Sequence, residues 1–345
     1  MHITTGDMSP KRVILLTSNI FSSSRDIRLV SPLLIILLVV TLSLIPTTAF
    51  SQMTIRKITD CNCVVFRLDD IQDGWIDSGQ ITLMDLFLSK HLPLSLGLIM
   101  NDIGNDPDIV DKVREGSQTG LFELALHGWD HVDYTKLSER VQESTLAQAN
   151  QKMERIFGRT SDIFITPYGT FNDATLQAMN RYGLKILSSV FFAEDNFDHG
   201  KSVFVANGKS NTNNNNNNAK LGIYHLPATV AYKEEEGNRF IKNSIESILA
   251  TVDQNIAQYG YSVIMLHPQD FMILDQKGDV TETLDDNEIK DLTLLIDSLL
   301  TKNIEITSFS KVVESMPESQ AIPEDNGDTV PSVPELSNPI VFNPS

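Results

Sequence analysis

Short apolar runs alternate with stretches of helical period along the chain from Cys63 onward. An apolar run bounded by polar residues predicts a buried strand, and apolar residues that recur every three or four positions predict an amphipathic helix. The predicted strands cover residues 63–68, 94–100, 121–126, 162–166, 184–190, 221–226, 261–266 and 304–309. The predicted helices cover residues 79–91, 106–117, 139–157, 172–183, 239–258 and 286–302. Because strands that alternate with helices form parallel sheets, this order predicts an α/β fold with a closed or nearly closed barrel.

Three polar segments fall outside this order. The Asn-rich tract at 207–220 cannot bury apolar surface, which predicts an exposed loop. The acidic stretch at 232–239 is also expected to be a solvated loop. The tail at 317–345 is rich in Pro, Ser, Asp and Glu, a composition that predicts disorder. The folded part is therefore expected to end near residue 316.

The first 51 residues form a separate segment. Basic residues precede an apolar run from Leu33 to Ile45, and the small residues Ala49 and Ser51 follow with the spacing of a cleavage site. The run is shorter than the roughly 20 residues of a membrane-spanning helix. Residues 1–51 are predicted to be a cleaved signal peptide, with an uncleaved N-terminal membrane anchor as the alternative. Either one places the domain at 52–316 outside the cytoplasm, secreted or attached to a membrane.

Composition narrows the class of partner. The chain has 345 residues, of which 41% are hydrophobic, enough to bury a sizeable core. Its 27 Lys and Arg residues against 45 Asp and Glu residues give a formal net charge of −18, which repels polyanions. Nucleic acid is therefore not an expected partner. Cys61 and Cys63 are the only cysteines, and because a disulfide across one residue is strained, they are expected to be plain strand residues.

Polar side chains follow several predicted strands at their carboxyl ends. Asp69 and Asp70 follow the first strand, His127 the third, Tyr168 the fourth, and His267 the strand at 261–266. The carboxyl ends of parallel strands build the active-site face of a barrel. Residues far apart in sequence are therefore expected to converge there, which favours an enzyme.

The spacing of His127 and His131 indicates a metal site. Two imidazoles four positions apart can reach one ion, and His with carboxylate suits zinc and similar divalent metals. Two adjacent carboxylates repel each other unless a cation neutralises one of them, so one of Asp69 and Asp70 can hold the metal while the other takes a proton from water. The alternative is that both aspartates cap a turn, which would leave the His pair unexplained.

At these residues the chain resembles the polysaccharide deacetylase family. The segment FRLDD matches the first motif of the family, HGWDH the second, TPYG the third and MLHP the fifth. The motifs occur in family order and lie between residues 63 and 315. The resemblance implies a single catalytic domain with the distorted (β/α) barrel of that family.

The resemblance also implies a role for each matched residue. Asp69 would be the general base, and His267 the general acid that protonates the leaving amine. The metal ligands would be Asp70, His127 and His131, with zinc as the usual ion. The backbone N–H of Tyr168 would stabilise the oxyanion. The implied function is metal-dependent removal of N-acetyl groups from an amino-sugar polysaccharide or oligosaccharide, so an N-acetylated glycan is the expected substrate.

One position departs from the family motifs. The third motif begins with an Arg that holds the catalytic Asp through a charge-assisted hydrogen bond, and here that position is Ile165. Arg67 or Asn172 could orient Asp69 instead, and strand alternation puts Arg67 on the same face as Asp69. The fourth motif, which orients the acid His, is not clear, and its candidates are Glu194, Asp195 and Asp198.

The missing Arg leaves two other functions open. One is a catalytically weak homologue that binds carbohydrate, and the other is a hydrolase of another non-peptide amide C–N bond. His225 is expected to be a structural residue or to line the cleft. Trp75 and Trp129 could stack against a sugar or pack in the core. His91 and His199 are expected to be ordinary residues.

Overall fold

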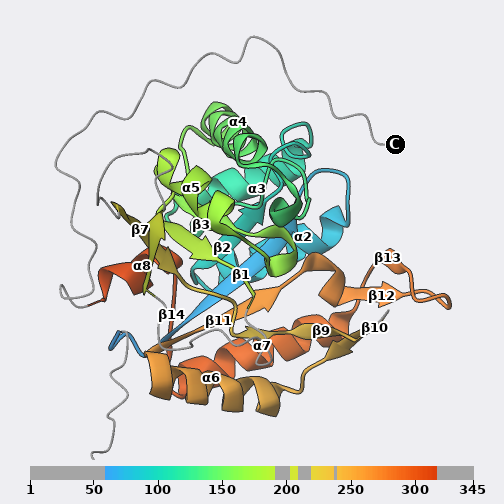
Figure 1. Cartoon of the computed structure of the whole chain (residues 1–345). Coiled ribbons are helices and arrows are strands. Elements are labelled where there is room, and N and C mark those ends of the chain that lie inside the picture. Colours follow the sequence, from blue (N-terminus) through green and yellow to red (C-terminus); the bar gives the residue numbers. More distant parts are fainter. Residues whose placement is uncertain (1–58, 191–202, 209–218, 237–238, 317–345) are drawn as a thin grey trace, which may run out of the picture. The chain divides into compact units, whose positions relative to one another are not determined.

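The computed structural model describes residues 59–190, 203–208, 219–236 and 239–316 (Figure 1). These residues belong to one compact unit, Ile55–Ser345. The predicted signal peptide or anchor at 1–51, residues 209–218 of the Asn-rich tract and the tail at 317–345 lie outside the described residues. The same holds for residues 191–202, which include Glu194, Asp195, Asp198 and His199.

A ten-stranded sheet forms the centre of the fold. The strand order is β6-β7-β5-β4-β3-β2-β1-β11-β8, and β14 also pairs with β1. Every neighbouring pair is parallel except β6 with β7. The strands are β1 (Cys63–Ile71), β2 (Leu94–Leu98), β3 (Phe122–Leu126), β4 (Ile163–Ile165), β5 (Ile186–Ser188), β6 (Val203–Gly208), β7 (Ala219–His225), β8 (Val230–Ala231), β11 (Tyr261–Leu266) and β14 (Glu305–Thr307). The order of the described strands does not return to its start, so the predicted (β/α) barrel is confirmed in a distorted, open form.

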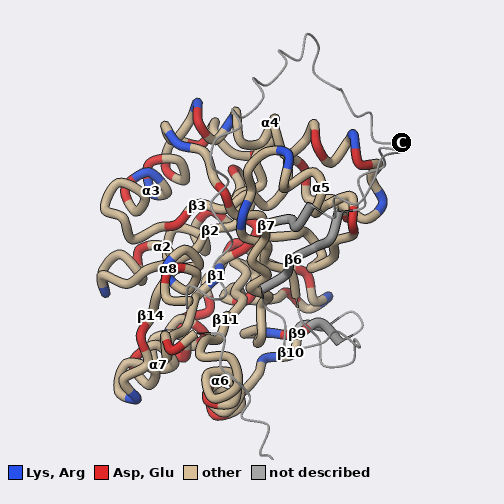
Figure 2. The backbone as a smooth tube through the Cα atoms, turned by 60° about the vertical axis from the view of Figure 1, so that its left-hand side comes forward, with Lys and Arg blue, Asp and Glu red and all other residues tan. Residues whose placement is uncertain are grey.

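Helices connect most of the successive strands (Figure 1). They are α2 (Asp77–Ser89), α3 (Pro107–Gln118), α4 (Glu139–Phe157), α5 (Asp173–Arg181), α6 (Ile245–Tyr259), α7 (Asp286–Thr301) and α8 (Phe309–Glu314). Their ends follow from local sequence. At α3 the Asp106 side chain accepts from the N–H of Asp108 and Pro107 takes the first position. Gly158, with a left-handed φ of 71°, ends α4. Many charged positions lie on these helices (Figure 2).

The side chains of β1 alternate between two apolar clusters. Val64, Phe66 and Leu68 join the cluster that contains the buried side of the helices. Val65 lies in the second cluster, together with Ile165 of β4. Burying side chains of this kind contributes about 1.5–3 kcal/mol each to folding. Since successive residues of a strand point to opposite faces, the polar residues at 67 and 69 follow Val65 on the face of the second cluster.

The predicted helix at 239–258 is wrong at its start. Arg239–Lys242 is instead strand β10, which pairs antiparallel with β9 (Lys233–Glu236), so the acidic stretch expected to be a loop forms a hairpin. Helix α6 begins at Ile245 because the Ser244 side chain accepts from the N–H of Ser247 and caps it. Lys242 also binds α7 through its ion pairs with Glu288 and Asp291. A second hairpin, β12 (Met272–Leu274) with β13 (Val280–Leu284), follows the 3-10 turn η3 (Pro268–Phe271).

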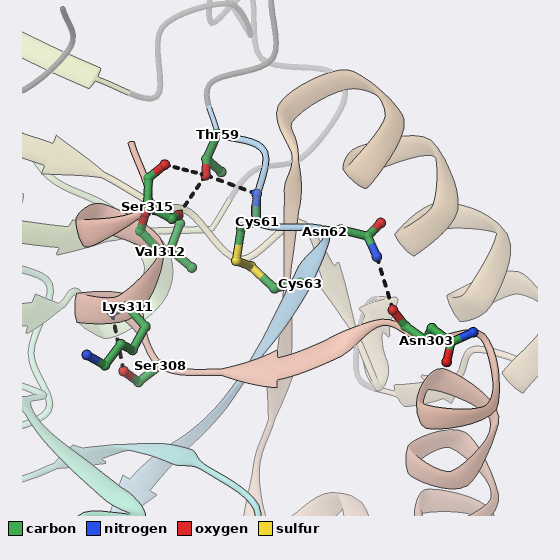
Figure 3. Close-up of a disulfide and its surroundings, with 9 residues drawn as sticks. All are labelled: Thr59, Cys61, Asn62, Cys63, Asn303, Ser308, Lys311, Val312 and Ser315. Carbon is green, nitrogen blue, oxygen red and sulfur yellow. Dashed lines mark hydrogen bonds between the residues drawn. A yellow bond between two sulfur atoms is a disulfide. The ribbon is translucent and has the colours of Figure 1, made fainter. Parts of the chain in front are cut away.

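The expectation that the cysteines are plain strand residues is also wrong. Cys61 and Cys63 form a disulfide at the start of β1, with their Cα atoms 5.2 Å apart (Figure 3). Asn62 between them has a φ of 53°. This left-handed residue bends the backbone, which brings the two cysteines within the usual Cα distance of a disulfide. Beside them the Thr59 hydroxyl lies 2.6 Å from that of Ser315, so the first and last described segments meet at this end of β1.

No helix within the described ranges is long and apolar enough to span a membrane.

Candidate active site

The predicted site residues follow strands that are neighbours in the sheet. Asp69 and Asp70 lie near the carboxyl end of β1, His127 follows β3, and His267 follows β11. Tyr168 lies in the 3-10 turn η2 (Pro167–Gly169), directly after β4. The carboxyl ends of these parallel strands share one edge of the sheet. The expected convergence of distant residues is therefore observed.

A bulge at the end of β1 turns Asp70 out of the strand. Leu68 pairs with Leu96 of β2, but the next pair is Ile71 with Leu98, so β1 has one extra residue there. Asp70 has a φ of 63°, in the left-handed region that few non-glycine residues adopt. Bulges re-aim side chains, and they are common beside active sites. This bulge explains how two adjacent aspartates can serve one site.

Asp70, His127 and His131 form the one cluster of three metal-ligating side chains found among the described residues. One ligand atom of each lies within 4.8 Å of the others. The Nε2 atom of His127 is 3.1 Å from Asp70 Oδ1, and the Nε2 atom of His131 is 3.3 Å from the same oxygen. The donor set of two imidazoles and one carboxylate suits a divalent metal, zinc in particular.

The hydrogen bond at the far side of His127 fixes its tautomer. Nδ1 of His127 lies 3.0 Å from the backbone oxygen of Ile165. A carbonyl oxygen only accepts, so the proton must be on Nδ1, and in the neutral ring Nε2 then presents its lone pair toward Asp70. A metal ligand held in this way by a second hydrogen bond is typical of histidine sites. The residues present therefore fit a divalent ion.

His131 and Asp70 have pKa values that favour metal binding. Burial lowers the pKa of His131, against the opposing charge of Asp70, which favours the neutral imidazole that a metal needs. Burial alone would raise the pKa of Asp70. The close contact with His127 and the charges of the nearby histidines outweigh burial and lower that pKa well below its usual value. Asp70 is therefore a carboxylate at neutral pH.

Asp69 lies beside the metal-ligand cluster, and Arg67 holds it. The Nε atom of Arg67 lies 2.9 Å from Oδ1 and 3.0 Å from Oδ2 of Asp69, and Nη2 lies 2.6 Å from Oδ2. Each of the two residues is only 1% exposed. Gly97 of β2 leaves room for this carboxylate, since a Cβ there would lie 3.2 Å from Asp69 Oδ1. Of the two orienting residues considered from sequence, Arg67 makes the contact.

Asn172, the other residue considered, has a structural role. Its side chain accepts from the N–H of Thr175 and caps α5, and the Thr175 hydroxyl accepts from the N–H of Asn172 in return. Ile165, at the position of the family Arg, is fully buried in the second apolar cluster. Its side chain packs there, while its backbone oxygen serves His127.

His267 has a carboxylate partner that the sequence analysis missed. Asp270 accepts from the backbone N–H of His267 at 2.9 Å, and its Oδ2 lies 3.7 Å from His267 Nδ1. Burial would lower the pKa of His267, but Asp270, with help from Asp69 and Asp70, raises it from 6.5 to about 9. His267 is therefore protonated at neutral pH and can donate a proton. Asp270 occupies a capping position three residues after His267, with Pro268 at the start of the turn, and this pattern could have revealed it.

Tyr168 stands at the exposed side of the site. It is 64% exposed, and its ring centre is 4.7 Å from that of His131. Its φ of 57° is left-handed, like that of Asp70. Backbone strain of this kind occurs most often at functional sites. The contact with His131 brings Tyr168 to the metal-ligand cluster, as the third motif implies.

Two residues considered from sequence, His225 and Trp129, take part in packing. His225 is 3% exposed, its Nε2 lies 2.7 Å from the Ser189 hydroxyl, and burial lowers its pKa to about 4. Trp129 packs against the first apolar cluster, with the Lys152 ammonium 5.6 Å from its ring centre. The Trp75 backbone oxygen accepts from the Gln80 side chain. His91 is exposed, at the end of the segment that follows α2.

Comparison with known proteins agrees with this fold and these motifs. Residues 56–187 match the family model described as polysaccharide deacetylase. These residues therefore resemble the polysaccharide deacetylase family. The matched range includes the aspartate pair, the His pair and Tyr168. His267 and Asp270 lie beyond it.

Two kinds of known protein are similar to this chain. YxkH of Bacillus subtilis (strain 168), which carries the name of a polysaccharide deacetylase, is 25% identical over 148 residues. That match covers 42% of this chain and spans half the length of YxkH. A Mycobacterium smegmatis protein named as a polysaccharide deacetylase shares the fold with a TM-score of 0.56 and 14% identity, over 79% of this chain and 96% of its own. The Xyl-CE4 domain of a xylanase from the hindgut metagenome of Trinervitermes trinervoides aligns with a TM-score of 0.44 and 14% identity, over 73% and 89%.

Proposed function

We propose that this protein is a metal-dependent deacetylase that hydrolyses N-acetyl groups on an amino-sugar polysaccharide or oligosaccharide. The observation that carries the proposal is the Asp70, His127 and His131 cluster beside the buried carboxylate of Asp69. A protonated imidazole, that of His267, lies close enough to both aspartates for their charges to raise its pKa. Acid, base and metal ligands together are what amide hydrolysis requires.

Asp70, His127 and His131 would hold the divalent ion, with zinc as the first candidate because two imidazoles and one carboxylate leave an open position in its coordination. When bound, such an ion supplies Lewis-acid chemistry, which polarises a carbonyl and makes water more acidic. The histidines contribute neutral Nε2 atoms, and Asp70 contributes a carboxylate that remains ionised at neutral pH.

Asp69 and His267 divide the proton transfers. Asp69 takes a proton from the attacking water, because Arg67 holds its carboxylate in place and Asp69 is not one of the proposed metal ligands. His267 gives its proton to the leaving nitrogen, which would otherwise depart as a poor, anionic leaving group. The N–H of Tyr168 is the proposed donor to the oxyanion. The C–N bond breaks, the acyl carbon gains an oxygen from water, and acetate and an amine are released.

We further propose that the domain works outside the cytoplasm, either secreted or attached to a membrane through its N-terminal segment. The Cys61–Cys63 disulfide supports this location, because disulfides persist mainly in oxidising compartments. The disulfide and the Thr59–Ser315 contact lie at the start of β1, whereas the candidate active site lies at its other end. Thr59, the first described residue, therefore lies at the end of β1 that is remote from the site.

The absence of Arg at position 165 was the reason to consider a homologue that binds carbohydrate without turnover. The Arg67–Asp69 ion pair supplies the missing contact, so this reason no longer favours a binding role. A different amide substrate is the alternative, since the residue roles proposed above concern only the amide group and not the sugar.

Acetate release by the purified full-length protein tests the proposal. The substrates are N-acetylglucosamine oligomers, with small N-acetylated amines as the comparison for another amide. Release from the oligomers, and its loss in Asp69→Asn but not in the matched surface variant Asp297→Asn, would support the deacetylase. Asp297 pairs with Lys90 on the surface and is 54% exposed. Tight oligomer binding without acetate release would instead support the carbohydrate-binding role.

A further inference from the structure

We propose that Arg67 is the positioning residue for the general base Asp69, and that it performs from β1 the task that the family motif assigns to an Arg at position 165. This inference rests on the proposed function. It concerns a residue of the first strand, two positions before the base, where the motif of the resemblance has no such role.

The guanidinium holds both oxygens of the carboxylate. Three contacts of 2.6–3.0 Å join Arg67 to Asp69, and they involve both Oδ1 and Oδ2. A contact to one oxygen would leave the carboxylate free to rotate, whereas contacts to both oxygens fix its plane. Residues two apart on a strand point to the same face, so the pair is built within β1 itself.

The other side of the guanidinium is fixed by two further strands. Nη1 of Arg67 donates to the Ser188 hydroxyl at 2.9 Å and to the Ser189 backbone oxygen at 3.0 Å, both at the end of β5. Nη2 lies 3.2 Å from the Met265 sulfur of β11. The Ser188 hydroxyl donates in turn to the backbone oxygen of Leu226 at 2.7 Å. The position of the Asp69 carboxylate therefore depends, through Arg67, on three strands: β1, β5 and β11.

Burial makes this arrangement necessary. Arg67 and Asp69 are each 1% exposed, so water cannot take over the contacts of either charge. A buried charge that loses its partner is strongly destabilised. Among the described residues, the hydrogen bonds of Arg67 go to Asp69, Ser188, Ser189 and Met265 and not to the metal-ligand cluster, so its effect on the reaction is expected to act through Asp69.

Position 165 faces the same interior. Ile165 belongs to the buried cluster that also contains Val65 and Met265, and Met265 touches Arg67. An Arg at 165 would extend into this interior, where Ile165 is fully buried. One carboxylate can neutralise one guanidinium, so the chain has room for an Arg at 67 or at 165 but not for both.

The test is a swap of the two positions in the full-length, metal-loaded protein. Arg67→Met should lower kcat for acetate release about 10²-fold, with KM changed by less than about twofold, because orientation of a reacting group acts mainly on the chemical step. Adding Ile165→Arg to Arg67→Met should raise kcat by about tenfold or more. Metal bound per chain should stay as in the wild type. Arg114→Met, which removes a partly exposed Arg of α3, should leave kcat unchanged.

Rescue by the second substitution is the outcome that a merely structural role of Arg67 would not produce. If Arg67→Met does not fold, Arg67→Lys takes its place, since it keeps the charge but loses the fork that contacts both oxygens. Arg67→Lys should lower kcat about tenfold at unchanged KM. Wild-type kcat in either folded variant would overturn the inference. Absence of acetate release by the wild type would instead show that the proposed function is wrong, so the two failures are distinguishable.

Discussion

A residue with left-handed backbone conformation lies at each end of β1, and the two serve different purposes. Asn62, just before the strand, has a φ of 53°, and Asp70, near its carboxyl end, has a φ of 63°. At the first end the left-handed residue brings Cys61 close to Cys63, and the two form a disulfide. At the second it turns Asp70 out of the strand and toward the His pair.

The difference lies in what holds each end. The amino end is held by a disulfide and by the contact between Thr59 and Ser315. The carboxyl end is held by a buried ion pair, where a left-handed non-glycine residue costs about 1–2 kcal/mol and persists because the surroundings impose it. Substitutions at the carboxyl end are therefore expected to lower activity first. Substitutions at the amino end are expected to lower only the free energy of unfolding.

The largest effect is expected from the metal ligands. His131→Ala should remove a ligand that faces Asp70 at 3.3 Å, so the protein should lose both metal affinity and acetate release. A metal titration followed by the acetate assay checks this. The control is His91→Ala, an exposed histidine outside the cluster, which should keep both properties. Metal binding at wild-type affinity in His131→Ala would show that His131 is not a metal ligand.

A smaller loss is expected from Asp69→Asn, which separates catalysis from metal binding. The amide cannot take a proton, so kcat should fall about 10³-fold while metal affinity is kept. The charge of Arg67 would also lose its partner, which should lower the free energy of unfolding by about 3 kcal/mol. Kinetics and urea unfolding measure the two effects. Turnover within tenfold of the wild type would exclude Asp69 as the base.

Asp270→Asn should change the pH dependence more than the maximal rate. Asp270 raises the pKa of His267 to about 9, so the acid is protonated below that pH and activity should fall as pH rises through it. Without Asp270 the pKa should drop toward 6.5, and the alkaline limb of the kcat profile should move to lower pH.

The same shift predicts a change in stability. Because the folded pKa of His267 is raised, its contribution to stability is complete below 6.5 and is lost as pH rises through about 9. The difference in free energy of unfolding between wild type and Asp270→Asn should therefore be larger at acidic than at alkaline pH. An alkaline limb that stays in place in Asp270→Asn would show that another group sets it.

The smallest effect is expected at the amino end of β1. Replacing both Cys61 and Cys63 by Ala opens a very short loop, so the free energy of unfolding should fall by only about 1–2 kcal/mol. Metal affinity and kcat should not change, because the disulfide lies at the end of β1 away from the site. A kcat that fell in the folded double variant would mean that the two ends of the strand are coupled.

Sequence patterns predicted the parts of the site that depend on spacing and strand order. The spacing of His127 and His131 and the aspartate pair after an apolar strand predicted this cluster, and the family resemblance selected Asp70 as its carboxylate. The bulge in β1 was not predictable, because it appears only when β1 is aligned against β2. The disulfide was missed for a similar reason, since it depends on the left-handed backbone of Asn62.

The partners of Asp69, the proposed base, and His267, the proposed acid, were only partly predictable. Strand alternation placed Arg67 and Asp69 on one face, but their contact depends on Ser188 and Met265, which are 121 and 198 positions from Arg67. Asp270, the partner of His267, could have been predicted from a local capping pattern, but that pattern was not recognised. The hairpin at 233–242 was missed because its acidic first strand suits a solvated loop and its second strand was predicted as the start of a helix, although Ser244 marked the true start of α6.

Acetate release before and after metal removal tests the central claim most directly. The wild-type protein would be treated with a chelator, assayed on N-acetylglucosamine oligomers, and assayed again after one equivalent of zinc is restored. Release should stop without the ion and return with it, and His131→Ala should gain nothing from added zinc. Release at an undiminished rate by the chelated, metal-free protein would contradict the account.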